Sequence, residues 1–147
     1  MPKKKKNGMP RIDVQSAIIC DDVRKEANGK DILIGVYSGI IVTSFPCDLI
    51  LSIWIQHNTI GAGEVPLAVK LVGPHDVEYF QVSMSGRFDG KIDVSSFHFN
   101  GIIAPVQMEG QLKLLLKQYD EEWKLIKKLS VKQSAARKVT QPTSKEA

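Results

Sequence analysis

The most constraining feature of this sequence is an alternation of apolar and polar residues with a period of two. The segment LILSIWIQH places Leu49, Leu51, Ile53 and Ile55 on one face of an extended chain. The same alternation recurs in VPLAVKLV, YFQVSMSGRF and QLKLLLKQ. A period of two is typical of β-strands that bury one face, whereas an amphipathic helix needs a period near 3.6. The sequence therefore predicts an all-β fold.

Turn signals separate these segments. Asn28-Gly29, Asp89-Gly90 and Asn100-Gly101 each supply a residue that tolerates the positive φ of tight turns. Many short strands joined by turns are typical of a sandwich or a small barrel, and burial of one face per strand favours the sandwich. We predict one antiparallel β-sandwich of about eight or nine strands.

One segment allows two interpretations. QLKLLLKQYDEEWKLIKKL, within residues 111–131, can form two strands folded about Tyr119–Glu122, or it can end in a helix over Asp120–Lys132. The hairpin is preferred because the first half of the segment alternates cleanly.

Charge is unevenly distributed along a chain whose net charge is +4. Residues 1–11 carry +5, residues 124–147 carry +6, and the body between them carries −7. Both ends lack large apolar residues and periodicity, which is typical of disordered segments. The predicted organisation is a disordered basic arm (residues 1–10), a β-sandwich domain (11–131) and a disordered basic tail (132–147).

The basic ends are candidates for binding polyanions. Such clusters attract nucleic acid without reading its sequence, because neutralised phosphates release condensed counterions. The predicted polyanion-binding residues are Lys3, Lys4, Lys5, Lys6, Arg137 and Lys138. The alternative is that these lysines only keep the chain soluble.

Asp21 and Asp22 raise the question of a paired-carboxylate site. If Asn28-Gly29 forms a two-residue hairpin loop, Asp22 lies opposite Gly35 and Asp21 opposite Val36. Neighbours along a strand point to opposite faces, so the two carboxylates diverge, which argues against acid/base catalysis. Asp22 shares its face with Arg24, so we predict a structural polar role for Asp22 and Arg24.

The stretch CDDVRKEANGKDILIGVYSGIIVTSFP resembles a family of short, uncharacterised bacterial β-rich proteins. That family has an early DDVR-like strand, a GK turn, an IGVY-like strand and a later Pro-Asp turn. Here the later turn is Gly73-Pro74-His75-Asp76, in which His75 is inserted. The resemblance covers roughly residues 12–120. It implies a β-sandwich-like fold and brings no activity and no functional residues.

Metal and catalytic sites have only weak candidates. The segment DGKID resembles part of a calcium loop, so Asp76, Asp89 and Asp93 form a candidate loop-borne metal site. A zinc site would need the fold to gather residues that are scattered in the sequence: His57, His75, His98, Cys20 and Cys47. The sequence contains none of the common nucleophile, zinc-protease or phosphate-loop motifs. We predict no cofactor and no catalytic residue.

Two further positions are ambiguous. Cys20 and Cys47 both fall in strand-like segments, where two buried free thiols are expected and one bridge is possible. Trp54 lies on the opposite face from Leu51 and Ile53, so either that strand is buried on both sides or Trp54 lies at a contact surface.

The favoured function is a cytoplasmic, non-catalytic binding or accessory module that recognises a protein through a sheet face or an exposed edge strand. The amino terminus has no apolar segment after its lysines, and no apolar run reaches the roughly 18 residues of a membrane helix. The alternatives are a nucleic-acid-associated protein that uses its tails, and an enzyme with a loop site that includes His75, Asp76 and Asp89.

Overall fold

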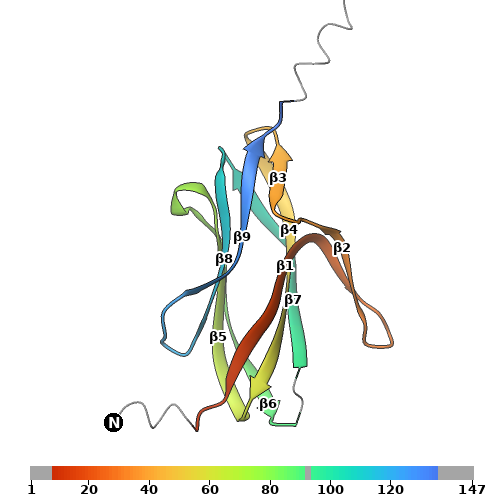
Figure 1. The fold of residues 1–147 in the computed structure, drawn as a ribbon, viewed down its shortest axis with the longest axis vertical. Coiled ribbons are helices and arrows are strands. Elements are labelled where there is room, and N and C mark those ends of the chain that lie inside the picture. Colours follow the sequence, from red (N-terminus) through yellow and green to blue (C-terminus); the bar gives the residue numbers. More distant parts are fainter. Residues whose placement is uncertain (1–7, 92–93, 136–147) are drawn as a thin grey trace, which may run out of the picture.

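The computed structural model describes residues 8–91 and 94–135, which form nine strands in two facing sheets (Figure 1). The four-stranded sheet has the order β2-β1-β4-β7, and the five-stranded sheet has the order β3-β9-β8-β5-β6. The strands are β1 (Arg11–Lys25), β2 (Asp31–Val36), β3 (Ile40–Thr43), β4 (Cys47–Ile60), β5 (Ala62–Val72), β6 (Glu78–Asp89), β7 (Val94–Val106), β8 (Gly110–Gln118) and β9 (Lys124–Gln133). The predicted all-β sandwich is confirmed, with one exception to its antiparallel pairing: β3 lies parallel to β9.

The core lies between the sheets and consists of the apolar members of the alternating segments. Leu51, Ile53 and Ile55 of β4 are fully buried, and Leu112 and Leu114 of β8 face them from the other sheet. Alternation places the intervening residues on the outer faces, and every strand except β2 contributes to one shared core.

The chain passes from one sheet to the other between β4 and β5. Gly61 has a φ of +82°, and Gly63 follows with a φ of +127°. A Cβ atom on Gly61 would lie 3.4 Å from the Cα atom of Pro10. The glycines therefore allow a sharp corner to pack closely against the segment that leads into β1.

The β1–β2 hairpin has a longer loop than predicted. The Glu26 amide donates to the Lys30 carbonyl at 2.8 Å, and this hydrogen bond closes the loop. The strands begin to pair at the next residues outward, Lys25 and Asp31. Asp22 is therefore opposite Ile34 and not Gly35, and the predicted register is wrong by one residue. The Asn-Gly pair does form the turn, but within a loop that is one residue longer than the two-residue type.

Asn100-Gly101 is not a hairpin turn, which corrects the expectation from sequence. Both residues lie inside β7, where Ile53 pairs with Phe99 and Leu51 pairs with Ile102, so the strand bulges. Gly101 has a φ of +72° at this bulge. A bulge and a tight turn need the same positive φ, so the dipeptide alone cannot distinguish them.

The segment after residue 110 is the predicted hairpin, because β8 and β9 pair antiparallel on either side of the Tyr119–Trp123 loop. The helical alternative is wrong. β9 ends at Gln133, so it includes two residues that the sequence assigned to the tail. Within residues 8–91 and 94–135, no helix is long and apolar enough to cross a membrane.

Candidate functional site

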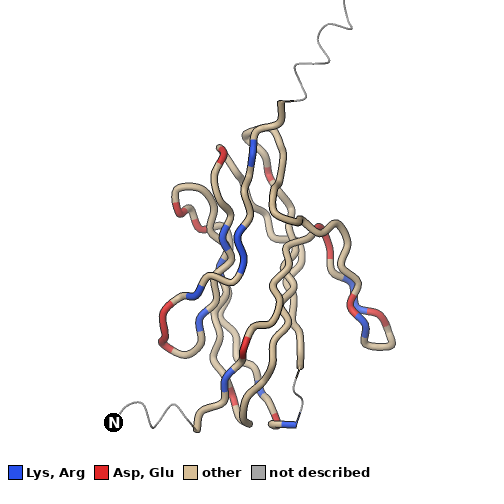
Figure 2. The backbone as a smooth tube through the Cα atoms, viewed as in Figure 1, with Lys and Arg blue, Asp and Glu red and all other residues tan. Residues whose placement is uncertain are grey.

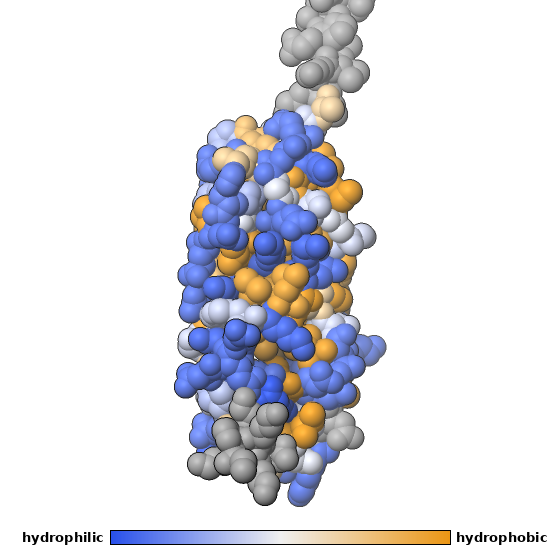
Figure 3. Space-filling view, turned by 60° about the vertical axis from the view of Figure 1, so that its left-hand side comes forward, coloured by the Kyte–Doolittle hydropathy of each residue, from blue (hydrophilic) through white to orange (hydrophobic). Residues whose placement is uncertain are grey.

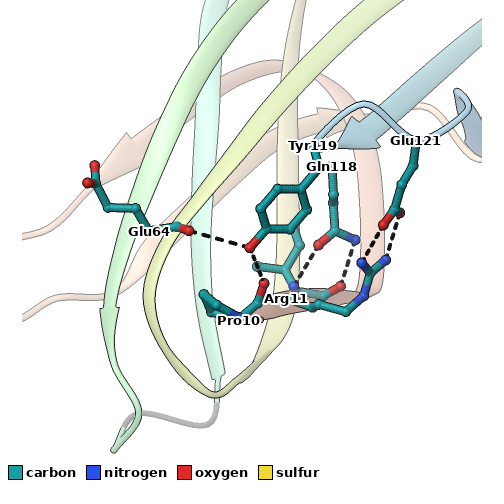
Figure 4. Close-up of polar contacts among 7 residues, drawn as sticks. Pro10, Arg11, Glu64, Gln118, Tyr119 and Glu121 are labelled. Atoms are coloured by element: carbon teal, nitrogen blue, oxygen red, sulfur yellow. Dashed lines mark hydrogen bonds and ion pairs between the residues drawn. The ribbon is translucent and has the colours of Figure 1, made fainter. Parts of the chain in front are cut away.

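Side-chain contacts hold the start of β1 against the β8–β9 hairpin and so join the two sheets (Figure 4). The Arg11 guanidinium donates to both carboxylate oxygens of Glu121, at 2.6 and 2.8 Å. The Tyr119 hydroxyl donates to the Pro10 carbonyl at 2.6 Å. The hydrogen bond from Arg11 to Glu121 raises the pKa of Arg11 above its usual value. These bonds position the first residues of β1 relative to the five-stranded sheet.

Gln118 takes the place of a neighbouring strand at Ile12. Its side-chain amide donates to the Ile12 carbonyl at 2.9 Å and accepts from the Ile12 amide at 2.9 Å. This reciprocal pair imitates one peptide unit of a strand. Ile12 therefore directs its N–H and C=O away from β4, toward the outer edge of the four-stranded sheet.

Beyond Ile12, β1 has an open edge. β2 reaches only the far half of β1, where the Tyr37 amide donates to the Ile19 carbonyl at 3.0 Å. Backbone groups alternate in direction along a strand, and a bulge between Val14 and Ser16 shifts the phase. Val14 and Ala17 consequently point the same way as Ile12 and Ile19. In the described part of the chain no strand pairs with them on that side.

A second open edge faces this one across the side of the sandwich. β3 pairs with β9 only over Ser130–Gln133, so among the described residues no strand pairs with the first half of β9 on that side. Between the two edges runs a groove of about 250 Å³. Its lining residues are Ile12, Asp13, Val14, Gln15, Ser16 and Ala17 of β1, with Leu116, Gln118, Lys124, Leu125 and Ile126 of the hairpin. The volume is below the roughly 300–1,000 Å³ of pockets that enclose small ligands, so the groove does not match a pocket of that kind.

Asp21 and Asp22 each have a different local partner and do not form a pair. The Tyr37 hydroxyl donates to Asp21 Oδ1 at 3.0 Å, and Asp21 lies over Gly35, which has no side chain to obstruct it. Burial and this hydrogen bond raise the pKa of Tyr37. Arg24 Nε donates to Asp22 Oδ2 at 3.0 Å. Gly35 thus makes room for Asp21. The predicted register had placed Gly35 opposite Asp22 instead.

A largely buried carboxylate, that of Asp31, was not singled out from the sequence; it fixes the β1–β2 hairpin onto the outer face of its own sheet. Trp54 Nε1 and Ser96 Oγ each donate to Asp31 Oδ2 at 2.9 Å. The Lys25 ammonium lies 3.2 Å from Asp31 Oδ1. The hydrogen bond from Trp54 leads the contacts that hold the pKa of Asp31 below its usual value. The sequence indicated a contact here in one respect: Trp54 lies on the opposite face of its strand from the core residues Leu51 and Ile53.

The structure does not bring the candidate metal ligands together. Asp76 lies in the turn before β6 and Asp89 ends that strand, so the length of β6 separates them. Asp89 Oδ1 instead accepts from the Lys91 amide at 2.8 Å, and Asp93 lies outside the described residues. Among the described residues, no group of three or more His, Cys, Asp or Glu could hold a metal ion.

The histidines and cysteines are also dispersed. His57 is buried in the core between Phe88 and Phe97, and burial lowers its pKa. His98 lies opposite Trp54 on β7, and His75 lies in the turn before β6. Cys20 is a buried free thiol and Cys47 a half-buried one, so they form no bridge. The predicted polyanion-binding residues Lys3–Lys6, Arg137 and Lys138 lie outside the described residues.

Comparisons with known proteins give a family but no activity. No curated protein matches the chain. An immunoglobulin-like protein from Pseudomonas aeruginosa, known from a crystal structure, is similar with 14% sequence identity and a TM-score of 0.39, over 86% of this chain and 97% of that one. The model of a family of unknown function, DUF6941, matches residues 15–132. The chain therefore belongs to the DUF6941 family of unknown function.

Proposed function

We propose that this protein is a non-catalytic binding module that acts through protein–protein contacts, and that the open edge of β1 is its contact surface. The observation that carries the proposal is the unpaired backbone of Val14 and Ala17, between the Gln118 side chain and β2. An extended segment of a partner can add to such an edge, where backbone hydrogen bonds supply affinity and alternate side chains supply specificity.

The opposite side of the sandwich is packed differently. There β6 and β7 are the edge strands, and aromatic side chains fill the space between the sheets. The ring centroids of Phe80 and Phe99 are 5.4 Å apart, and those of Phe97 and Phe99 are 5.8 Å apart. Natural proteins cover or block an edge that must stay unpaired. On the β1 side a groove runs beside the open edge, and Gln118 covers only one position of that edge. The opposite side has a pocket of about 460 Å³ between the ends of β6 and β7, which is lined by side chains and not by an open stretch of β1.

A library of displayed random peptides, selected against the full chain, tests this function. We expect enriched peptides with alternating apolar and polar residues that compete with one another. Ala17→Pro removes the outward N–H without disturbing the ladder to β4, because proline is tolerated where an edge N–H faces solvent. Loss of one backbone hydrogen bond should weaken peptide binding about tenfold.

Ala17→Ser is the matched control, since it changes the side chain but keeps the N–H. It should bind peptides within about twofold of the unchanged protein. Both variants should melt at nearly the same temperature as the parent. Peptides that bind Ala17→Pro and the parent equally well would place the contact elsewhere and contradict the proposal. A cytoplasmic location, nucleic-acid binding by the tails and a loop-borne catalytic site stay predictions from the sequence.

A further inference from the structure

The outer face of the five-stranded sheet gathers lysines that are far apart in the sequence. Lys70 of β5 alternates with fully buried core residues, so it points outward, and its cross-strand partner Leu115 shares that face. Alternation along β8 then places Lys113 and Lys117 on the same face, and Lys128 of β9 is the partner of Lys113. These four residues are named the lysine face.

The carboxylates of this sheet lie at its margins. Figure 2 shows lysines along β8 and β9 and acidic residues mainly in the loops at the strand ends. Glu78 lies on the edge strand β6, and Glu64 lies 3.7 Å from Arg87. In the described part of the chain, no ion pair within 4.0 Å involves a residue of the lysine face. Residues 11–133, which contain the nine strands, have 13 basic and 15 acidic residues, a net charge of −2, and yet one face is basic.

Lys113 and Lys128 are directly opposite one another, which opposes folding. Cross-strand partners have Cβ atoms about 4.5–5.5 Å apart, and like charges at that position are destabilising. A carboxylate at either position would instead form a favourable pair. The arrangement suits a ligand that brings negative charge to the face.

An aromatic ring lies within the lysine face. The Lys70 ammonium is 4.3 Å from the Trp123 ring centroid, and the Lys117 ammonium is 5.1 Å from it. Both contacts are within the range of cation–π attraction. Trp123 is half-buried. Ala68 is the cross-strand partner of Lys117 and is buried, although its side chain belongs to the outer face of the sheet. Figure 3 turns this side of the molecule forward and shows hydrophilic side chains around a smaller apolar area.

We propose that the lysine face and Trp123 bind single-stranded nucleic acid, with the ammonium groups on phosphates and the indole available to a base. Proteins that bind single strands without reading sequence combine a basic surface with aromatic stacking platforms. A flat sheet cannot enter the groove of a duplex as a helix or a β-ribbon does, so duplexes should bind less well. Lys70 and Lys117 place positive charge beside the Trp123 ring, which does not suit the ring to insert into the apolar interior of a lipid bilayer.

The test measures fluorescence anisotropy of a labelled single-stranded oligonucleotide with the full chain, at several salt concentrations. Lys113→Gln/Lys128→Gln removes two phosphate contacts and should weaken binding at least about tenfold at low salt. It should also reduce the slope of log K against log salt by about 1.4, since each contact to a single strand contributes about 0.7. Lys30→Gln/Lys91→Gln is the matched control, because both lysines are exposed in loops and the change in net charge is the same. The control should bind within about twofold of the parent.

Three results would overturn the proposal. If both double variants lose affinity equally, or neither does, binding depends on net charge or on the basic ends. If a duplex of the same length binds as tightly as the single strand, the face is not a single-strand site. If vesicles containing phosphatidylserine bind and oligonucleotides do not, the partner is a membrane. Removal of the opposed lysines should not lower the melting temperature, so a loss of binding would not reflect unfolding.

Discussion

At the scale of single residues, one side chain marks where the paired part of β1 ends. Gln118 supplies both hydrogen bonds that Ile12 would otherwise receive from a strand. Asp31 joins the hairpin to its sheet differently, through side-chain contacts of an almost buried carboxylate with Trp54 and Lys25. Gln118 substitutes for a backbone partner at one position, and the unpaired stretch of β1 begins where that substitution ends.

Gln118→Ala should destabilise the fold by about 1–3 kcal/mol, because two part-buried hydrogen bonds to Ile12 are lost and a typical hydrogen bond contributes about 0.5–1.5 kcal/mol. Urea unfolding measures the change. Gln15→Ala is the control, since Gln15 bonds only to Asp13 in an exposed position and its loss should change stability by less than about 0.5 kcal/mol. Equal effects of the two substitutions would show that Gln118 does not act as a strand substitute.

Asp31 should make stability depend on pH. Its folded pKa lies below the unfolded value of about 3.9, so its ionised form stabilises the fold above that value, and the contribution is lost as pH falls through the folded pKa. The difference in unfolding free energy between the parent and Asp31→Asn should be constant above about pH 5 and should shrink below about pH 4. A difference that stays constant to pH 2 would contradict the assigned contacts.

At the scale of elements, bulges and loops decide which residues meet. The bulge in β7 places Asn100 where its amide accepts from the Val23 N–H at 3.0 Å and donates to the Val23 carbonyl at 2.9 Å. This contact lies past the point where β1 and β4 stop pairing, at Cys20 and Ser52. The bulge therefore lies where β1 stops pairing with β4 and continues in the sheet with β2 alone.

Gly101→Ala tests the bulge. Its φ of +72° costs an L-residue about 1–2 kcal/mol, although a Cβ atom would have nothing within 4 Å. Gly39→Ala is the control, because the space there is equally open and no positive φ is present, so its effect should stay within about 0.5 kcal/mol. Chemical denaturation of both variants measures the difference. If Gly101→Ala is as neutral as Gly39→Ala, the positive φ at the bulge is not needed.

At the scale of the whole molecule, the strands and two local hairpins could be predicted from sequence, but the neighbours of strands that are distant in the sequence could not. Period-two alternation identified the core residues of β4 and the β8–β9 hairpin, because burial of one face acts on each strand separately. The groove depends on two edges more than a hundred positions apart, Ile12–Ala17 and Lys124–Ile126. No local sequence pattern indicates that the edge of a strand stays unpaired. The lysine face was hidden for the same reason, since its members belong to three strands.

Hydrogen exchange measured by NMR on the full chain, with and without a selected peptide, tests the open edge of β1 most directly. In the free protein the amides of Val14 and Ala17 should exchange rapidly, while that of Ile18, which faces β4, should be protected. Bound peptide should slow exchange at Val14 and Ala17 and leave Ile18 unchanged. Protection of Val14 and Ala17 in the free chain, or peptide-induced protection confined to another edge, would contradict the account.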